Sequence, residues 1–323
     1  ADFNVAIGGC AMFTNTTGAA NTALGRNALY ANSTGSGNTA VGCGALDTNT
    51  TASDNTAIGA EALQANTTGA NNTSIGKNSM QTTTTGEENV AIGSNALLDN
   101  TTGSRNVAIG RRSLQENTTA ESNTAVGNSA MQNNTTGTQN VAVGSGALDS
   151  NTTAGCNTSI GHGSMGDNTE GHSNVAIGRT ALGSNITGDS NVAVGSIALV
   201  AATTANNNTV VGFCAGDTIT TGQDNTLIGF NATPNLSTGA NNVSIGDVGS
   251  FGSRLFNITT ESNRFLAGHT SITNAYVKVA WTVTSDLRDK TNFGTVPHGL
   301  DFINKLEPVS FQFRKSREDD TPH

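Results

Sequence analysis

Residues 89–105 read NVAIGSNALLDNTTGSR, and residues 106–122 repeat the pattern as NVAIGRRSLQENTTAES. An Asn opens a similar unit every 17 residues from Asn4 to Asn242, which makes 15 copies without an insertion. A strict period of this kind is typical of chains whose coils stack in register. The sequence therefore predicts a parallel β-solenoid, or β-roll, of 15 seventeen-residue coils in an all-β protein.

The first five positions of each copy predict a strand and a corner. Position 1 is Asn, position 2 is Val or Thr, position 3 is mostly Ala or Ser, and position 4 is β-branched in every copy except Leu24. Such residues favour a strand. Position 5 is Gly in all 15 copies, from Gly8 to Gly246. We therefore expect a backbone bend that a Cβ atom would obstruct.

The remainder of each copy predicts the return path. The Ala-Leu pair, as in Ala147-Leu148, favours a second short strand, with a single helical turn as the alternative. Segments such as Asn134-Thr135-Thr136-Gly137 favour a turn in which Asn and Thr side chains bond to nearby backbone and Gly accepts a positive φ. This turn would close each coil.

The composition indicates a thin, repetitive core. Only 4% of the 323 residues are aromatic, while 35% are hydrophobic, and the formal net charge is -9. That charge disfavours nucleic-acid binding, and no apolar run is long enough to cross a membrane. The sequence begins Ala1-Asp2 without Met, so we expect a processed product or a fragment.

A single coil of this kind is too small to fold alone, because ordering the backbone costs about 1–2 kcal/mol per residue. Ala91 and Ile92 would face opposite sides of a strand, so one side chain fills the coil and the other needs cover from outside. We expect the coils to stack into a rod of roughly 70 Å, with the position 1 Asn residues as an amide ladder. Parallel sister chains in a homotrimer would cover the outer side.

The composition changes near residue 247, because residues 1–246 hold five aromatic residues and the last 77 hold nine. We expect a solenoid shaft over residues 1–258, a β-rich connector over 259–284, and an incomplete mixed α/β segment over 285–323. In the last part, GLDFINKL predicts a helix and VSFQF a strand.

Two resemblances sharpen this interpretation. The NTAVG…AL…NTTG units resemble head repeats of YadA-type trimeric autotransporter adhesins, which form left-handed parallel β-rolls, and resemble repeats of marine phage tail fibres still more closely. The stretch SITNAYVKVAWTVTSDLRDKTNFGTVPHGLDFINKLEPVSFQFR resembles the start of the endosialidase-type intramolecular chaperone of phage tail spikes and fibres, with cyanophage fibres the nearest likeness. That resemblance implies a domain that trimerises, templates the folding of a β-rich shaft and releases itself by cleavage.

The same resemblance implies catalytic roles within SDLRDK, residues 285–290. Ser285 would be the nucleophile and Lys290 its partner, with scission of the Ser285–Asp286 bond. A Lys amine acts as a base for a Ser hydroxyl only when burial or a neighbouring cation lowers its pKa. The motif by itself is also compatible with an ordinary polar loop.

Other motifs carry less chemistry. Residues 161–166 match GxGxxG but lack a following helix, and His162 and His172 lack a third ligand, so we expect no cofactor and no metal site. The four cysteines have irregular spacing, which favours free thiols. The Asn-Thr-Thr segments also match the glycosylation pattern, but turn formation already accounts for them. Acidic residues occupy different positions in different copies and form no continuous ladder for calcium, as shown by Asp47, Asp149, Asp99 and Asp167. The four cysteines are Cys10, Cys43, Cys156 and Cys214.

The sequence thus predicts a structural and adhesive protein, namely the shaft of a viral tail fibre used in host attachment and located on the virion. Expected partners are its own sister chains, other tail or fibre proteins and a host surface receptor, with a glycan as one candidate. The alternative is a bacterial trimeric surface adhesin or extracellular filament, and a less favoured one is an ice-binding solenoid. Enzymatic turnover is not expected beyond a single self-cleavage.

Overall fold

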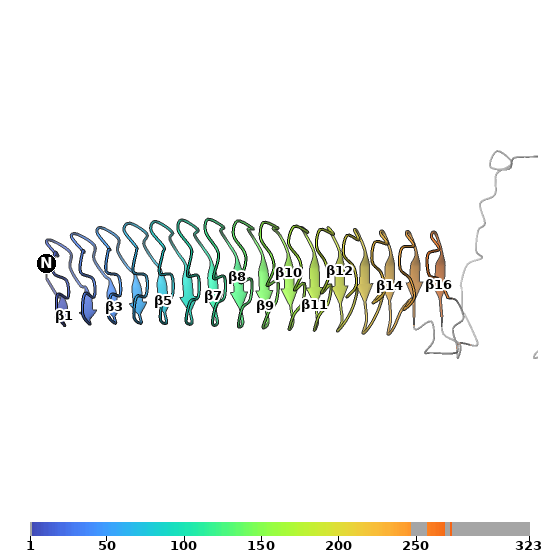
Figure 1. Ribbon diagram of the computed structural model, residues 1–323, viewed down its shortest axis with the longest axis horizontal. Helices are drawn as coiled ribbons and strands as arrows, with labels where there is room; N and C mark the ends of the chain where they lie inside the picture. Colours follow the sequence, from blue (N-terminus) through green and yellow to red (C-terminus); the bar gives the residue numbers. More distant parts are fainter. Residues whose placement is uncertain (1, 247–256, 269–271, 273–323) are drawn as a thin grey trace, which may run out of the picture. The chain divides into compact units, whose positions relative to one another are not determined.

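The computed structural model describes residues 2–246, 257–268 and 272. These residues form three-residue strands and no helix. All the strands belong to one parallel sheet that follows the chain from β1 to β16, so the coils stack in sequence order along one axis (Figure 1). The strands are β1 (Val5–Ile7), β2 (Thr22–Leu24), β3 (Thr39–Val41), β4 (Thr56–Ile58), β5 (Thr73–Ile75), β6 (Val90–Ile92), β7 (Val107–Ile109), β8 (Thr124–Val126), β9 (Val141–Val143), β10 (Thr158–Ile160), β11 (Val175–Ile177), β12 (Val192–Val194), β13 (Thr209–Val211), β14 (Thr226–Ile228), β15 (Val243–Ile245) and β16 (Phe265–Ala267).

Equivalent positions of neighbouring copies lie opposite one another in the sheet. Ala91 of β6 pairs with Ala108 of β7, and Ile92 pairs with Ile109. The same offset of 17 residues relates all pairs from β1 to β15. The predicted β-solenoid with seventeen-residue coils is therefore confirmed.

The glycine at position 5 makes the corner that follows each strand. Gly93 has a φ of +137°, and a Cβ atom on it would lie 2.6 Å from the carbonyl oxygen of Gly110 in the next coil. Any other residue would be disfavoured for two reasons, because side chains with a Cβ atom rarely adopt this φ and because backbone of the next coil occupies the space. The predicted glycine corner is confirmed.

The Ala-Leu pair forms a turn, so the expected second strand is wrong. Leu148 has a φ of +54°, and Gly146 two residues earlier has a φ of +63°. Left-handed residues so close together cannot continue a strand or a right-handed helix. The conformation costs about 1–2 kcal/mol for Leu, and burial of the Leu side chain returns about 1.5–3 kcal/mol.

The turn nevertheless stays bonded to the stack. The Leu148 N–H donates to the carbonyl oxygen of Ser164 at 3.0 Å. Inside the same coil, Leu148 packs with Ala142 and Ala147, and all three side chains are fully buried. A core of one Leu and two Ala residues per coil is as thin as the composition predicts.

The Asn residues at position 1 form the predicted ladder, although each bonds mainly to backbone. The backbone N–H of Asn106 donates to Oδ1 of Asn89 at 2.9 Å, and Nδ2 of Asn106 donates to the carbonyl oxygen of Ala120 at 2.9 Å. One bond joins neighbouring coils, and the other closes the coil to which the Asn belongs. The side chains are fully buried, so they are structural.

The Asn-Thr-Thr-Gly segment closes each coil by a different geometry from the one expected. Nδ2 of Asn134 donates to the carbonyl oxygen of Gly137 at 3.0 Å, which is the predicted local bond. The Thr135 hydroxyl instead donates to the carbonyl oxygen of Thr152 in the next coil at 3.0 Å. The positive φ falls two residues after the Gly, at Gln139 with +60°, so the expectation of a left-handed Gly is wrong.

Position 12, the first residue of that turn, forms a second ladder that the sequence reasoning did not identify. Nδ2 of Asn134 also donates to Oδ1 of Asn117 at 3.0 Å. We call residues 4–190 the amide coils, because position 12 is Asn there in every copy except at Thr83. We call residues 191–246 the apolar coils, because the position is occupied there by Ala202, Ile219 and Leu236.

The rest of the interior changes one copy later, because residues 191–207 still hold Ala193 and Leu199 in the core. Position 3 enlarges to Val210 and then Leu227, and Gly216 replaces the Leu of position 9. A Cβ atom on Gly216 would lie 3.0 Å from Cδ1 of Leu227 and 3.1 Å from Cδ1 of Ile219. The larger side chains therefore fill the space that Leu occupies in the other coils.

The stack continues beyond the last regular copy. Val243 of β15 pairs with Phe265 of β16, a step of 22 residues in place of 17. Arg264 takes position 1, and its backbone N–H donates to Oδ1 of Asn242 at 3.0 Å. The sheet thus extends past residue 258, where the sequence analysis ended the shaft. The helix and strand expected in residues 285–323 lie outside the described residues.

Candidate functional site

The predicted catalytic residues Ser285 and Lys290, and the Ser285–Asp286 bond between them, lie outside the described residues. Their geometry is therefore not part of the site described below. Within the described residues, the feature most unlike an ordinary protein surface is the outer side of the sheet.

Positions 2 and 4 of the strands form a continuous surface that we call the apolar strip. In β6 these positions are Val90 and Ile92, while the intervening Ala91 is fully buried. Ile92 exposes 37% of its surface, and Ile228 in β14 exposes 42%. Because alternate residues of a strand face opposite sides, every strand from β2 to β15 adds one β-branched or Leu side chain and one Val or Thr to the strip.

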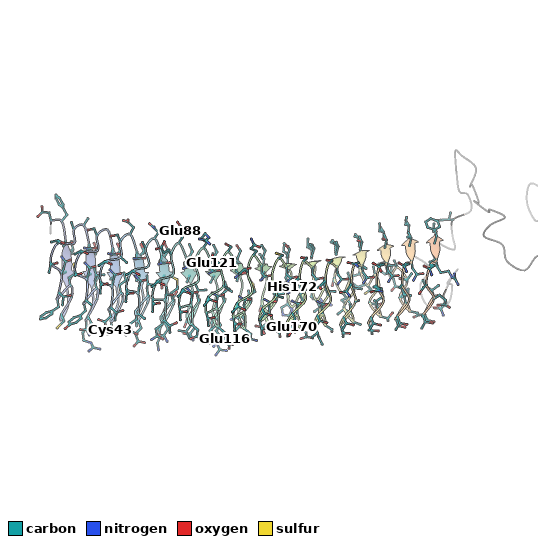
Figure 2. The ribbon with its side chains drawn as sticks, turned by 90° about the horizontal axis from the view of Figure 1, so that it is seen from above. Cys43, Glu88, Glu116, Glu121, Glu170 and His172 are labelled. Atoms are coloured by element: carbon teal, nitrogen blue, oxygen red, sulfur yellow. The ribbon has the colours of Figure 1, made fainter. Side chains whose placement is uncertain are left out.

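No charged residue occupies positions 2 or 4 in any of the 15 copies. Charges lie instead at other outward positions of the coil. Figure 2 shows Glu88 and Glu121 along one edge of the rod, and Glu116 along the other edge. Glu121 forms an ion pair with Arg105 in the neighbouring coil. The strip is therefore free of charge along its whole length, and exposed apolar surfaces of this kind are typical of interaction sites.

Acidic residues at the coil edges are spread over different positions. Partial burial raises the pKa of the carboxyl groups of Asp47, Asp99 and Asp149 above the usual value. Among the described residues no group of three or more His, Cys, Asp or Glu side chains could hold a metal ion. The same residues contain no helix that is long and apolar enough to cross a membrane.

Position 16 carries a third set of bonds between coils. The Nδ1 atom of His172 accepts a hydrogen bond from the backbone N–H of Gly155 at 2.9 Å, and Asp189 Oδ1 accepts one from the N–H of His172 at 2.6 Å. Ser53 accepts in the same way from the N–H of Ser36 at 3.1 Å. His172 is thus an acceptor within the stack, and His162 is an exposed corner residue.

The GxGxxG segment and the cysteines have no shared site. Gly161 is a position 5 corner with a φ of +133°, and Met165 that follows is fully buried in the coil core. All four cysteines are free thiols. Cys43 accepts a hydrogen bond from Nη2 of Arg26 at 3.4 Å, and both side chains lie on the outside of the coil corner.

Two aromatic pairs stand out on the surface. Phe13 and Tyr30 stack at position 10 of the first two coils, with ring centroids 5.5 Å apart. Phe213 and Phe230 stack at position 6 of two apolar coils, with centroids 5.6 Å apart and an interplanar angle of 8°. Each ring of the second pair lies two residues after a position 4 residue of the apolar strip, directly after the glycine corner.

A comparison with protein families characterises the C-terminal residues. Residues 285–323 match the family model described as chaperone of endosialidase. Residues 285–323 are therefore similar to this chaperone family, as the resemblance in the sequence implied. The matched residues make up about an eighth of the chain, so the match characterises its C-terminal end. Comparisons with curated proteins and with solved structures found no match.

Sequence reasoning found the corner glycines and the first Asn ladder, and it missed the second ladder and the change of interior at residue 191. The recurrence of Asn at position 12, ending at Asn185, was a visible signal. So was the joint appearance of Val210, Gly216 and Ile219, which depart from the pattern within one copy. The first signal was masked by the turn propensity of Asn-Thr-Thr-Gly, which accounts for the same Asn.

Proposed function

We propose that this chain is the structural and adhesive shaft of a viral tail fibre, which acts in host attachment as part of the virion. The observation that carries the proposal is the joining of a chaperone-of-endosialidase segment, residues 285–323, to a long parallel solenoid. A chaperone segment is required where a repetitive β-structure folds slowly, because many pairings of nearly equal energy compete.

The solenoid suits a mechanical role. Each coil is bonded to the next through strand pairing, the position 1 ladder and the position 13 hydroxyls, as at Val141, Asn140 and Thr135. Bending the rod would break several of these bonds at one coil boundary. At about 4.8 Å for each strand, the stack extends over roughly 70 Å, and it would hold a receptor-binding part at a set distance from the particle.

A parallel homotrimer is part of the proposal. The apolar strip is about 70 Å long and about 10 Å wide for three-residue strands, which gives about 700 Å² for each chain. A stable interface buries about 800 Å² on each partner, so the strip supplies most of the area of one such interface, and in a trimer this area is shared between two neighbouring chains. A surface without charge avoids the cost of desolvating ions when sister chains pack together.

Release of the chaperone segment would be a single hydrolysis. The amide bond between Ser285 and Asp286 would be cleaved with consumption of one water molecule, leaving a carboxyl group on Ser285 and an amino group on Asp286. The neutral amine of Lys290 would accept the proton of the Ser285 hydroxyl as that oxygen attacks the carbonyl carbon of the Ser285–Asp286 amide. The C–N bond would then break, the Asp286 nitrogen would take that proton, and the one water molecule would hydrolyse the resulting ester and restore the hydroxyl. No cofactor is needed for this step.

Light scattering and intact mass of the purified full chain test the proposal together. We expect an assembly of three chains, and a shorter chain that ends at Ser285 when cleavage occurs. Ser285→Ala should leave every chain at its full mass while preserving the three-chain assembly, with Ser316→Ala as a matched control that changes nothing. A folded, soluble monomer of full length would contradict the trimer, and loss of the C-terminal fragment from Ser285→Ala would contradict the role of Ser285.

The rival function is a bacterial trimeric adhesin displayed on the cell surface, which would share the solenoid and the apolar strip. The chaperone match favours the viral fibre over this rival, since it supplies a folding device at the C-terminal end. The ice-binding alternative is disfavoured because the hydroxyls of one threonine row, such as Thr67 and Thr84, donate to carbonyl oxygens of the next coil at 3.0 Å and 3.1 Å. Such hydroxyls are already engaged.

A further inference from the structure

A strip of repeating composition hardly specifies the axial register, which is the position of one chain along the rod relative to its neighbour. This argument rests on the proposed trimer. Sliding a sister chain by one coil, about 4.8 Å, would again place β-branched side chains against β-branched side chains, as Ile92 and Ile109 illustrate. Sheet faces of uniform composition specify register only weakly. Some departure from the repeat must therefore select one alignment of the chains.

The aromatic pair in the apolar coils is such a departure. Phe213 and Phe230 expose 48% and 55% of their surface. Each lies two residues after a position 4 residue of the strip, Val211 or Ile228, around the glycine corner. The apolar surface is therefore widened by two phenyl rings at this level of the rod.

Position 6 is polar or small in all the other copies, from Gly9 to Asp247. The copies next to the pair carry Ser196 on one side and Asp247 on the other at this position. The two rings are stacked on each other with centroids 5.6 Å apart, so they form one apolar block two coils in height. A sister chain displaced by one coil in either direction would leave one ring opposite Ser196 of its neighbour and expose that ring to water.

We infer that Phe213 and Phe230 set the axial register of the sister chains in the assembled fibre. The occupant of this surface is a second copy of the same chain, whose own pair of rings lies at the same height. The apolar strip then provides most of the contact area, and the ring pair provides the alignment. Large apolar side chains that fit only one arrangement commonly add specificity to an otherwise uniform interface.

The experiment uses the full chain with a photoreactive side chain at Ile109, in assemblies formed from a mixture of ¹⁴N- and ¹⁵N-labelled protein. Cross-links between chains of different isotope identify the coil that faces Ile109 in a neighbour. In the otherwise unchanged protein we expect these cross-links to fall within residues 106–122. In Phe213→Ser/Phe230→Ser we expect a second set displaced by 17 residues, which accounts for at least a third of the total.

The chain contains a matched control in its other stacked pair. Phe13→Ser/Tyr30→Ser removes two stacked aromatic rings at position 10, away from the strip, and should leave all cross-links in register. A second variant separates register from folding. Adding Asn128→Phe/Ser145→Phe to the Phe213→Ser/Phe230→Ser variant places a ring pair at position 6 of two other coils, and it should restore a single register.

The outcomes are distinct. Cross-links that stay within residues 106–122 in the Phe213→Ser/Phe230→Ser variant would overturn the inference, and would assign register to other parts of the chain. Displaced cross-links that Asn128→Phe/Ser145→Phe does not correct would overturn it as well. A lack of any cross-link between isotopes in the unchanged protein, together with a monomer in light scattering, would instead contradict the trimer on which the inference rests.

Discussion

The amide coils and the apolar coils have the same backbone and a different interior. In the amide coils, Asn134 is held by hydrogen bonds to Asn117 and to its own turn. In the apolar coils, Ile219 occupies the equivalent position and belongs to the hydrophobic core. Both regions keep the glycine corner and the position 1 Asn. The backbone path is therefore set by these shared residues, and the interior can change when several positions change together.

The largest expected effect belongs to a residue that both regions share. Gly144→Ala in the amide coils and Gly229→Ala in the apolar coils should each lower the free energy of unfolding by about 4 kcal/mol or more. A Cβ atom on Gly144 would lie 2.5 Å from the carbonyl oxygen of Gly161, and Gly144 and Gly229 have φ angles of +138° and +137°. Circular dichroism during thermal and chemical denaturation measures the loss.

Gly146→Ala is the control for this pair, because Gly146 also has a positive φ of +63° but a Cβ atom there would contact nothing within 4 Å. It should cost only about 1 kcal/mol. An equally small effect of Gly144→Ala would show that the corner does not need glycine. It would contradict the idea that this residue sets the backbone path shared by the amide coils and the apolar coils.

Exchanging the interiors should give the next largest effects. Ile219→Asn places an amide among apolar side chains and should cost about 3–4 kcal/mol. Asn134→Leu removes the donor to Oδ1 of Asn117 and should cost about 2–3 kcal/mol. Ile219→Val, as the conservative control, should cost about 1 kcal/mol. If Ile219→Asn were tolerated as well as Ile219→Val, the two interiors would be interchangeable one residue at a time.

A smaller effect should reveal that the apolar coils changed as a set. Gly216→Leu alone should cost about 2–3 kcal/mol, because its Cβ would already touch Leu227. In the presence of Leu227→Ala the added Leu gains space, and the two changes together should cost at least 1 kcal/mol less than the sum of their separate effects. Denaturation midpoints of the four chains complete the cycle. Strict additivity would contradict the idea of a shared cavity.

The smallest effect is an opposite dependence on pH in the amide coils and in the irregular coil that follows the apolar coils. Burial raises the pKa of Asp149 in the amide coils, so the folded chain holds that proton more tightly and stability increases as pH falls through the raised pKa. Beyond the apolar coils, hydrogen bonds from the N–H groups of Thr259 and Thr260 to the carboxylate lower the pKa of Glu261. Its contribution is present above the usual pKa and is lost as pH falls through the lowered one.

Asp149→Asn should therefore raise stability slightly at pH 7 and reduce the gain on acidification, while Glu261→Gln should lower stability at pH 7 and leave that gain in place. Melting temperatures between pH 3 and pH 7 separate the two variants. Identical profiles for the two variants would contradict the opposite signs, and the matched change of carboxylate to amide controls for size.

The repeat and its corner could be predicted from sequence because they depend on short-range sterics. Gly93 and its equivalents need a conformation that other residues avoid, and Ile92 alternates with Ala91 as a half-buried strand requires. Leu148 could not be assigned in this way, since its left-handed φ is disfavoured locally and is stabilised only by burial in the finished coil. Local propensity favoured a strand at Leu148, whereas packing in the finished coil stabilises a turn.

The candidate surface was predictable only in outline. That Ile92 faces outward followed from its spacing to Ala91, while the continuity of the strip required the register of all the coils. The role proposed for Phe213 and Phe230 depends on the stacking of their rings, which cannot be predicted from two residues that lie 17 apart in the sequence. The Ser285 and Lys290 assignment comes from resemblance, and it stays a prediction.

The constant step from one coil to the next has a consequence for how such a chain can evolve. Because the upper edge of one coil is complementary to the lower edge of the next in the same register, duplication or loss of a whole 17-residue copy joins two compatible edges and disturbs no loop. Selection could then adjust the reach of the shaft in increments of about 4.8 Å while leaving both of its ends unchanged.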